Sequence, residues 1–534
     1  MQLEKLTQIL NNINFKLLLK NKNNYFLIVL INSFLFSIYY GYRGVYPIDS
    51  FLIFNAGYKV LNNFHPFKDY WTITGPLLDY IQSVLFLIFK INWFSYVLHA
   101  ALINSLLATL SYYFFKKIGL QDFYSFIYSI SISILAYPTT GTPFMDHHGV
   151  IFSLLSIYFL MLAIKDNKIF FWFFSSIFLV LSFFSKQIPS SYLVPLIAVI
   201  ILIYLFFINK NRNEKYNIIF FILGGLLSVF FFSLIFYINN IPIKNFLIQY
   251  IYYPMSIGED RIVNIKFDIK NVFLNFKFIY FSTIPLLFSL FFLIKKKTKG
   301  IDNKIDLVNI FIVLGSALIF IYTQIITKNQ ILIFFLIPFY LGMSHFYILK
   351  YFNKKYMLNI IILILIISTG KYHLRFNEHK KFMELEGADF KKAVDAGHLD
   401  KKLHRLKWIT LDYKNNPVIE LDLLKESIKI LKADKDNKII MTDYQIVPGL
   451  IKNTNYAPNK WFDMLSVPSK SNKYFDEYKS FFISSLKKQK IKNIYLIGGG
   501  KLKFLLPMFE KKECLDFKRI NTIFLKMGIE KCLL

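Results

Sequence analysis

The sequence predicts a polytopic α-helical membrane protein that carries a soluble α/β domain at its C-terminus. Hydrophobic residues make up 55% of the 534 residues and the mean hydropathy is +0.44, which is more apolar than a soluble chain of this length needs to be. The apolar residues form blocks long enough to cross a bilayer. After Gly370 the composition becomes mixed. We therefore divide the chain into a membrane part, 1–370, and a soluble part, 371–534.

Apolar runs of spanning length predict about eleven transmembrane helices. They lie near residues 25–42, 93–115, 121–138, 148–164, 169–184, 191–208, 218–238, 277–294, 306–326, 331–349 and 357–370. Basic clusters follow every second run, as expected for cytoplasmic loops: Lys116-Lys117, Lys165 with Lys168, Lys210–Lys215, Lys295–Lys299 and Lys350–Lys355. The basic N-terminal segment (Lys5, Lys16, Lys20, Lys22) has no signal-cleavage site and precedes a retained span. This topology puts the N-terminus in the cytoplasm and the C-terminal domain outside.

Residues 77–89 are apolar but too short to be counted as a span. These thirteen residues would reach about 20 Å as a helix, less than the ~30 Å hydrocarbon core. Counting them as a span would also move Lys116-Lys117 outside and invert every later loop. We therefore expect a juxtamembrane helix that lies in the outer interface, within a long first external loop, 43–92.

The net charge of +30 does not indicate nucleic-acid binding. Many of the cations lie in short clusters between apolar blocks, which is the pattern of a membrane protein with basic cytoplasmic loops. A basic, aromatic-interleaved soluble face is missing from the sequence. We therefore predict the lipid bilayer, and no nucleic acid, as a partner.

Polar residues of chemical interest gather in the predicted external segments. Asp49 is the first acid after the first span, Asp146 precedes two histidines, and Lys186 follows the fifth span. Arg261 lies in the long loop 239–276, and Lys328-Asn329-Gln330 is also external. A carboxylate that takes a proton, together with cations that hold a phosphate leaving group, suits transfer from a phospholipid-linked donor. The alternatives are a helix N-cap for Asp49 and ordinary loop cations for Lys186 and Arg261.

His147 and His148 leave metal binding open. Imidazole and carboxylate are suitable ligands, so Asp146-His147-His148 could hold a divalent metal. Adjacent histidines on a helix point about 100° apart, however, and do not easily serve one ion. We therefore assign no metal ligand and expect polar anchoring or substrate contact at this turn.

The C-terminal part predicts a small α/β domain with alternating strands and helices. Expected helices are 420–432 and 473–488, and expected strands are 438–441 and 493–497. The run Gly498-Gly499-Gly500 lacks the spacing of a phosphate loop and predicts a turn.

The remaining features of this domain leave alternatives. Trp408, Trp461 and Tyr444 are expected in the core rather than stacked on sugar rings. Cys514 and Cys532 either pair, if the compartment is oxidising, or stay free.

The first external loop resembles that of a known family. The segments Tyr46-Pro47-Ile48-Asp49, Ala56-Gly57, Leu61–Tyr70 and Thr74–Leu78 are similar to the first periplasmic loop of bacterial GT-C glycosyltransferases. These are relatives of the protein O-mannosyltransferases and aminoarabinose transferases (glycosyltransferase family 39). Two features depart from the pattern: Asn63-Phe64-His65 replaces the usual glycine position, and Asp49 stands alone where the mannosyltransferases have an Asp-Glu pair.

The resemblance implies a GT-C-like fold for residues 1–370 and roles for individual residues. Asp49 matches the catalytic acid, Asp146 the later acid, and Lys186 a donor-phosphate ligand. Arg261 could share the phosphate, although no motif assigns it. Asp69, in the motif of the first loop, joins His147 and His148 as a candidate substrate ligand.

The expected function is inverting transfer of a hexosyl or pentosyl group from a polyprenyl-phosphate donor. The acceptor would be an envelope glycan, lipid or protein on the periplasmic face of a bacterial inner membrane. No cofactor is assigned, and a divalent metal stays open. The alternative is a transporter or flippase of lipid-linked sugars, for which acids midway along spans, broken helices or internal repeats would speak.

Overall fold

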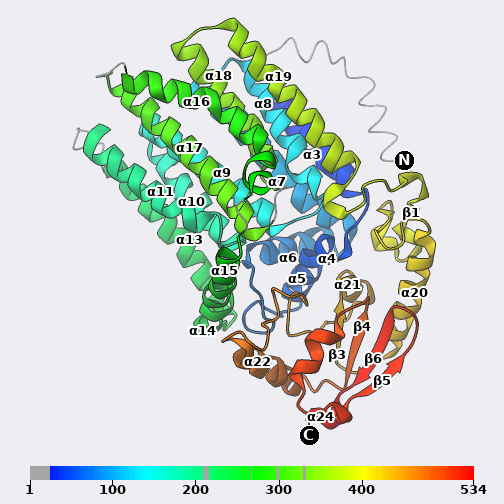
Figure 1. Ribbon diagram of the computed structural model, residues 1–534. Helices are drawn as coiled ribbons and strands as arrows, with labels where there is room; N and C mark the ends of the chain where they lie inside the picture. The colour runs from blue at the N-terminus through cyan, green and yellow to red at the C-terminus, as the bar shows by residue number, and fades with distance from the viewer. Residues whose placement is uncertain (1–23, 209–215, 266–267, 296–299, 329–331, 534) are drawn as a thin grey trace.

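The computed structural model describes residues 24–208, 216–265, 268–295, 300–328 and 332–533. It consists of a helical bundle with a small sheet-containing domain at one end (Figure 1). Several predicted features lie outside the described residues: the N-terminal lysines, the loop Lys210–Lys215, most of Lys295–Lys299, and Asn329 with Gln330.

Every run predicted to span the membrane contains a helix. Among the described residues, eight helical segments are long and apolar enough to cross a membrane. They are α3 (Asn24–Gly41), α7 (Trp93–Ile118), α9 (Met145–Asp166), α11 with η2 (Ser190–Ile203, Tyr204–Ile208), η3 with α13 (Tyr216–Ile218, Ile219–Ile238), α16 (Lys277–Lys295), α17 (Ile301–Thr327) and the segment that begins with α19 (Lys355–Tyr372). Three shorter helices complete the set: α8 (Asp122–Leu135), α10 (Ile169–Ser185) and α18 (Ile337–Tyr351). The count of eleven spans stays a prediction.

Helix α9 forms the centre of the bundle, because its whole 18-residue apolar window is buried. Small polar residues let α10 approach it closely. The Ser182 hydroxyl donates to the Gly149 carbonyl at 2.7 Å and lies 2.8 Å from the Ser153 hydroxyl. The start of α9 and the end of α10 are therefore held side by side.

The loops predicted to be cytoplasmic and the loops predicted to be external lie at opposite ends of the bundle. At the end that we call the inner end, Lys350 pairs with Asp306 at 2.5 Å, and Lys165 donates to the Lys117 carbonyl at 2.5 Å. The predicted external segments meet at the opposite, outer end, where Gln187 donates to the Ile73 carbonyl at 2.9 Å. Which end faces the cytoplasm stays a prediction.

The first external loop folds into three short helices: α4 (Pro47–Ser50), α5 (Leu52–Leu61) and α6 (Leu77–Phe89). Helix α6 has the bounds predicted for the juxtamembrane helix. Its last two turns expose apolar side chains, with Leu87 73% and Ile88 63% exposed, as expected for an interfacial helix.

The other short elements of the membrane part lie around the outer end. They are η1 (Tyr137–Thr139), α14 (Ile243–Phe246), η4 (Leu247–Tyr252), α15 (Tyr253–Val263), η5 (Lys270–Leu274), η6 (Phe334–Leu336) and η7 (His373–Glu378). Helix α19 continues into η7, past residue 370, so the division into 1–370 and 371–534 stays a proposal.

The C-terminal domain is built on a four-stranded sheet of order β3-β4-β6-β5. Strands β3 (Lys438–Thr442) and β4 (Asn493–Ile497) pair in parallel, and β6 (Phe524–Gly528) and β5 (Asp516–Arg519) add antiparallel. Helix α20 (Pro417–Ala433) packs on the face that carries Ile440 and Tyr495, and α22 (Phe475–Lys488) on the face that carries Ile439 and Ile494. This confirms the two predicted helices and the two predicted strands.

Smaller elements complete the domain. They are η8 (Lys381–Met383), η9 (Phe390–Lys392), β1 (Val394–Asp395), η10 (Ala396–His398), η11 (Lys401–Leu403), β2 (Lys407–Trp408), α21 (Val447–Ile451), α23 (Leu502–Leu505), η12 (Leu506–Met508), η13 (Lys512–Cys514) and α24 (Glu530–Leu533). Gly498 to Gly500 form the predicted turn, with positive φ at both ends. Cys514 and Cys532 form a disulfide.

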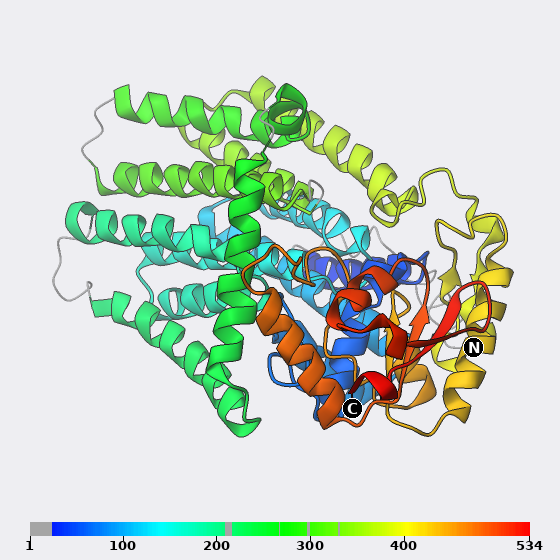
Figure 2. The ribbon, with the colours of Figure 1, turned by 60° about the horizontal axis from the view of Figure 1, so that its bottom comes forward.

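The domain lies against the outer end of the bundle. Figure 2 shows α22 beside the rod formed by α14 and α15. Asn472 donates to the Ser256 hydroxyl at 3.2 Å, and Lys244 pairs with Glu477 at 3.4 Å. The junction between the two parts therefore includes polar contacts as well as apolar packing.

Candidate active site

A cavity of about 720 Å³ lies at the outer end, between the bundle and the C-terminal domain. Its volume is in the range of small-molecule sites. Asp49, Asp146, Lys186 and Arg261 all line it. The fold therefore brings together four of the seven predicted site residues, which come from α4, the start of α9, the end of α10, and α15.

Asp49 is the third residue of α4 and not a helix cap, so the N-cap interpretation is wrong. The residue before α4 is Tyr46 and the residue before α5 is Phe51, and neither helix has a side-chain cap. Asp49 is half-buried, and among the described residues no side chain forms a hydrogen bond or ion pair with it. Its carboxylate is thus left available to a ligand in the cavity.

Burial raises the pKa of Asp49 to about 7. The negative charges of Asp146 and, more weakly, Asp463 add to this effect. Loss of water and nearby like charges both disfavour the ionised carboxylate. A carboxyl group with a pKa near neutrality can act as a general base at physiological pH.

Asp146 and Lys186 form an ion pair in the lining of the cavity. Asp146 lies in the first turn of α9, where the helix dipole favours a negative charge. Lys186 immediately follows α10, with an extended backbone. The packing of α9 against α10 places both residues at the cavity.

Gly75 lets the first external loop approach Lys186. Its backbone N–H donates to the Ser185 carbonyl at 3.1 Å. A Cβ at this position would lie 1.9 Å from the carbonyl oxygen of Phe184, so a side chain cannot be accommodated without movement of the backbone. The cavity wall at Ile73 and Thr74 depends on this close contact.

Arg261 lies in the last turn of α15 and is partly buried. Its Nη1 donates to the Ile326 carbonyl at 3.4 Å. Burial lowers the pKa of Arg261, while the charges of Asp146 and Asp463 favour its protonated form. The guanidinium group stays charged, as arginine does in proteins, and adds a second cation to the site.

The C-terminal domain supplies cavity residues that sequence reasoning missed. Trp461, Asp463 and Leu465 line the cavity. Asp463 Oδ1 accepts hydrogen bonds from the backbone N–H groups of Leu465 and Ser466, at 3.0 and 2.6 Å. The prediction that Trp461 belongs to the core is confirmed in part, because this residue packs against the hydrophobic core but is only partly buried and also lines the cavity. The segment is an irregular loop, and a Trp and an Asp two residues apart were its only signal.

Trp408 and Tyr444 follow the core prediction. Both donate to the buried carboxylate of Glu420, at 2.7 Å each. Their burial is nearly complete, so they do not offer a surface to a sugar.

Asp69 lies outside the cavity lining, and its assignment to substrate binding stays a prediction. Its Oδ2 accepts a hydrogen bond from the His65 backbone N–H at 3.0 Å, and its Oδ1 lies 3.6 Å from the Lys488 amine. Asp69 therefore shapes the turn of the first loop and contacts α22.

His147 and His148 are both fully buried within the bundle, and their assignment to substrate binding also stays a prediction. His147 Nδ1 lies 3.2 Å from the Thr140 hydroxyl. His148 contacts the Tyr137 hydroxyl and lies 3.0 Å from His99, nitrogen to nitrogen. These contacts fasten the start of α9 to its neighbours. Among the described residues, no group of three His, Cys, Asp or Glu residues could hold a metal ion.

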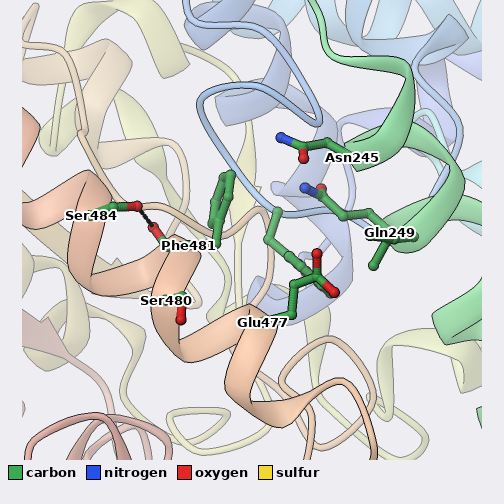
Figure 3. A pocket seen from close by; sticks show the side chains of 8 residues that line it. Asn245, Gln249, Glu477, Ser480, Phe481 and Ser484 are labelled. Carbon is green, nitrogen blue, oxygen red and sulfur yellow. Dashed lines mark hydrogen bonds between the residues drawn. The ribbon is translucent and has the colours of Figure 1, made fainter.

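A second hollow of about 310 Å³ lies on the outer surface, between η4 and α22. Figure 3 shows Asn245 and Gln249 on one wall and Glu477, Ser480, Phe481 and Ser484 on the other. Asn245 donates to the Phe67 carbonyl at 2.9 Å, and Gln249 accepts from the Thr72 backbone at 3.1 Å. These amides are engaged in holding the first loop, so this hollow is a seam between the two parts of the molecule.

Comparisons with known proteins leave the family of this chain open. No family model matches the sequence, and no curated protein matches it. Among solved structures, a crystal structure of an oligosaccharyltransferase from Archaeoglobus fulgidus, in complex with Zn and sulfate, matches with 13% identity and a TM-score of 0.45. The match covers 88% of this chain and 67% of that one. Similarity of this degree establishes neither a shared fold nor a shared function.

Proposed function

We propose that this protein is a membrane glycosyltransferase of the GT-C type. It transfers a hexosyl or pentosyl group from a polyprenyl-phosphate donor to an acceptor hydroxyl. The observation that supports this most is the convergence of three charged groups in one cavity: the carboxylate of Asp49, which has no side-chain partner among the described residues, and the cations Lys186 and Arg261. A base for the acceptor and positive charge for a phosphate leaving group are what the reaction needs.

In the proposed reaction, Asp49 takes the proton from the acceptor hydroxyl. The hydroxyl oxygen attacks the anomeric carbon from the side opposite the phosphate, and the bond between that carbon and the phosphate oxygen breaks. The configuration of the sugar is thereby inverted. Lys186 and Arg261 stabilise the polyprenyl phosphate as it leaves.

Asp146 has two parts in this proposal. Its ion pair orients the Lys186 ammonium group in the cavity. Its other carboxylate oxygen can accept a hydrogen bond from a sugar hydroxyl, and its negative charge contributes to the raised pKa of Asp49. The Asp146–Lys186 pair thus links the binding of the donor to the protonation state of Asp49.

We place the outer end on the periplasmic side of a bacterial inner membrane, with the N-terminus in the cytoplasm. The Cys514–Cys532 disulfide supports an oxidising compartment for the C-terminal domain. An envelope glycan, lipid or protein would be the acceptor, and the donor would enter from the bilayer. A transporter or flippase of lipid-linked sugars is less well supported, because the charged groups of the cavity lie at one end of the bundle and not midway along its helices.

The test is Asp49→Asn in membranes that are given a radiolabelled polyprenyl-phosphate sugar. Loss of the base should reduce transfer by about 100-fold to 10,000-fold. Asp412→Asn is the matched control, because Asp412 is an exposed acid of the C-terminal domain and should transfer as the wild type does. Transfer unchanged in the Asp49 variant would refute this mechanism.

A further inference from the structure

One wall of the cavity is a loop of the C-terminal domain, Pro458–Leu465, which we call the wall segment. It contributes Trp461, Asp463 and Leu465 to the cavity lining. The segment has no helix or strand of its own to hold it. Its position must therefore come from contacts with its surroundings.

The backbone of the wall segment is bound to the first external loop. Trp71 donates its N–H to the Pro458 carbonyl at 3.0 Å, and Lys460 donates its N–H to the Trp71 carbonyl at 2.9 Å. From the C-terminal domain itself, Gln445 donates to the Lys460 carbonyl at 3.0 Å. Lys460 is thus the residue at which both parts of the molecule meet.

The side chain of Lys460 crosses into the membrane part. Its ammonium group donates to Asp79 Oδ1 at 2.6 Å and to the Thr74 hydroxyl at 3.0 Å. Asp79 is the third residue of α6, and its Oδ2 accepts from the Tyr70 hydroxyl at 2.9 Å. Thr74 is itself one of the residues that line the cavity. One lysine therefore links two walls of the cavity.

Both charges of this pair are out of water, since the side chains are 3% and 0% exposed. Burying two charges is costly, and apolar residues of similar size often stabilise a fold as well or better. In some proteins such a pair is retained because it specifies a single geometry for the groups that it joins. Here those groups are the wall segment and the start of α6.

We propose that Lys460 and Asp79 are positioning residues that hold the wall segment in place as the acceptor side of the cavity. This inference rests on the proposed function. The wall segment belongs to the domain outside the bilayer, from which a water-borne or envelope acceptor approaches. The two cations Lys186 and Arg261 come from the membrane part, where the donor phosphate would be bound. The site is therefore incomplete without the C-terminal domain.

The test uses the full-length protein and four variants. Lys460→Met leaves Asp79 buried without its partner and is expected to destabilise the fold. The double variant Asp79→Asn with Lys460→Met removes both charges, keeps an acceptor for Tyr70, and should recover most of the stability. Lys460→Arg keeps the charge and should retain the wild-type behaviour in part. Lys438→Met is the matched control: Lys438 is a buried lysine of the same domain that pairs with Asp434 at 3.8 Å and does not line the cavity.

The first readout needs no substrate. Hydrogen–deuterium exchange of residues 458–465 should be about tenfold faster in the double variant than in the wild type, and unchanged in Lys438→Met. Exchange at wild-type rates in the folded double variant would overturn the proposal. This readout stays valid even if the chain transfers no sugar, so failure of the proposed function and failure of this inference can be told apart.

The second readout is transfer from a radiolabelled undecaprenyl-phosphate hexose. The acceptor is a titrated extract of envelope lipids and glycans. The double variant should require about tenfold more extract for half-maximal rate, while the maximal rate and the half-saturating donor concentration change by less than about threefold. A purely structural pair would leave the requirement for extract unchanged once the amount of folded protein is matched, and that result would contradict the proposal.

Discussion

The two ends of the helical bundle use charge in opposite ways. At the inner end, Lys350 and Asp306 neutralise each other, and Lys116 pairs with Asp122 at 2.6 Å. At the outer end, Asp146 and Lys186 also pair, but the Asp49 carboxylate has no side-chain partner among the described residues, and Lys186 and Arg261 both line a cavity. The inner end ties helices together by local pairs. The outer end keeps charge available for a ligand.

The difference shows why charged residues alone do not identify a site. Among the described residues of the inner end, Lys116 and Lys350 each pair with an acid of a neighbouring helix. The outer residues come from segments far apart in the chain, and the C-terminal domain covers them. A concave surface with unmatched charge is a stronger indication of function than a dense but paired one.

The largest expected difference between the two ends is their accessibility across the membrane. Lys244→Cys, at an outer position whose side chain is 79% exposed, should react with a membrane-impermeant maleimide in intact spheroplasts. Lys354→Cys, at an exposed inner position, should react only after permeabilisation. The native cysteines are joined in a disulfide and give no background. The reverse pattern would invert the topology. A cysteine at position 147 would be a poor reporter of accessibility, because His147 is fully buried.

Replacing one paired lysine at each end of the bundle compares the two ends directly. Lys186→Met should reduce the kcat/KM for donor by about 100-fold to 1,000-fold, because a positive charge at the leaving group is lost in a water-poor cavity. Lys350→Met removes a pair of similar geometry from the inner end and should change kcat/KM by less than about threefold per folded molecule. Equal losses in both variants would mean that Lys186 is only structural.

Arg261 should show a smaller effect that depends on the shape of its side chain. Arg261→Lys keeps the charge but loses the planar fork that binds a phosphate through two hydrogen bonds. We expect the half-saturating donor concentration to rise by about tenfold, with little change in kcat. Arg375→Lys, with an arginine that does not line the cavity, is the control. A wild-type donor requirement in Arg261→Lys would exclude a bidentate phosphate contact.

The smallest expected effect is the pH dependence that Asp49 contributes. Its pKa of about 7 in the folded protein lies above the ordinary value of about 3.9. The folded state therefore binds more protons than the unfolded state between these values, and stability falls as the pH rises through this window. Asp49→Asn should raise the melting temperature by about 2 °C or more at pH 8 and leave it unchanged at pH 4.

The same titration predicts that the transfer rate of the wild type rises with pH and levels off above about 7, as the base becomes ionised. Asp306→Asn provides the inner-end comparison. It should lower the melting temperature, because Lys350 loses its carboxylate. A flat pH–rate profile, or a variant at Asp49 that is less stable than the wild type at pH 8, would contradict the raised pKa.

Local patterns in the sequence determined most of the secondary structure. The apolar runs became helices, residues 77–89 became a separate short helix with an exposed apolar face, and β3, β4, α20 and α22 formed where the patterns placed them. These features depend on hydrophobic periodicity, which is visible in the residues of one segment alone. The sequence also singled out Asp49, Asp146, Lys186 and Arg261, because polar groups stand out beside long apolar runs.

Only the tertiary structure decided which of these polar groups meet. It separated Asp69, which contacts the His65 backbone within a turn, and the histidines His147 and His148, which are buried inside the bundle, from the four residues that line the cavity. It also brought Trp461 and Asp463 to Asp49 across some 400 residues of chain and buried Lys460 against Asp79. The physical reason is that burial, pairing and the resulting pKa depend on neighbours in space, and no local pattern of a single chain records them.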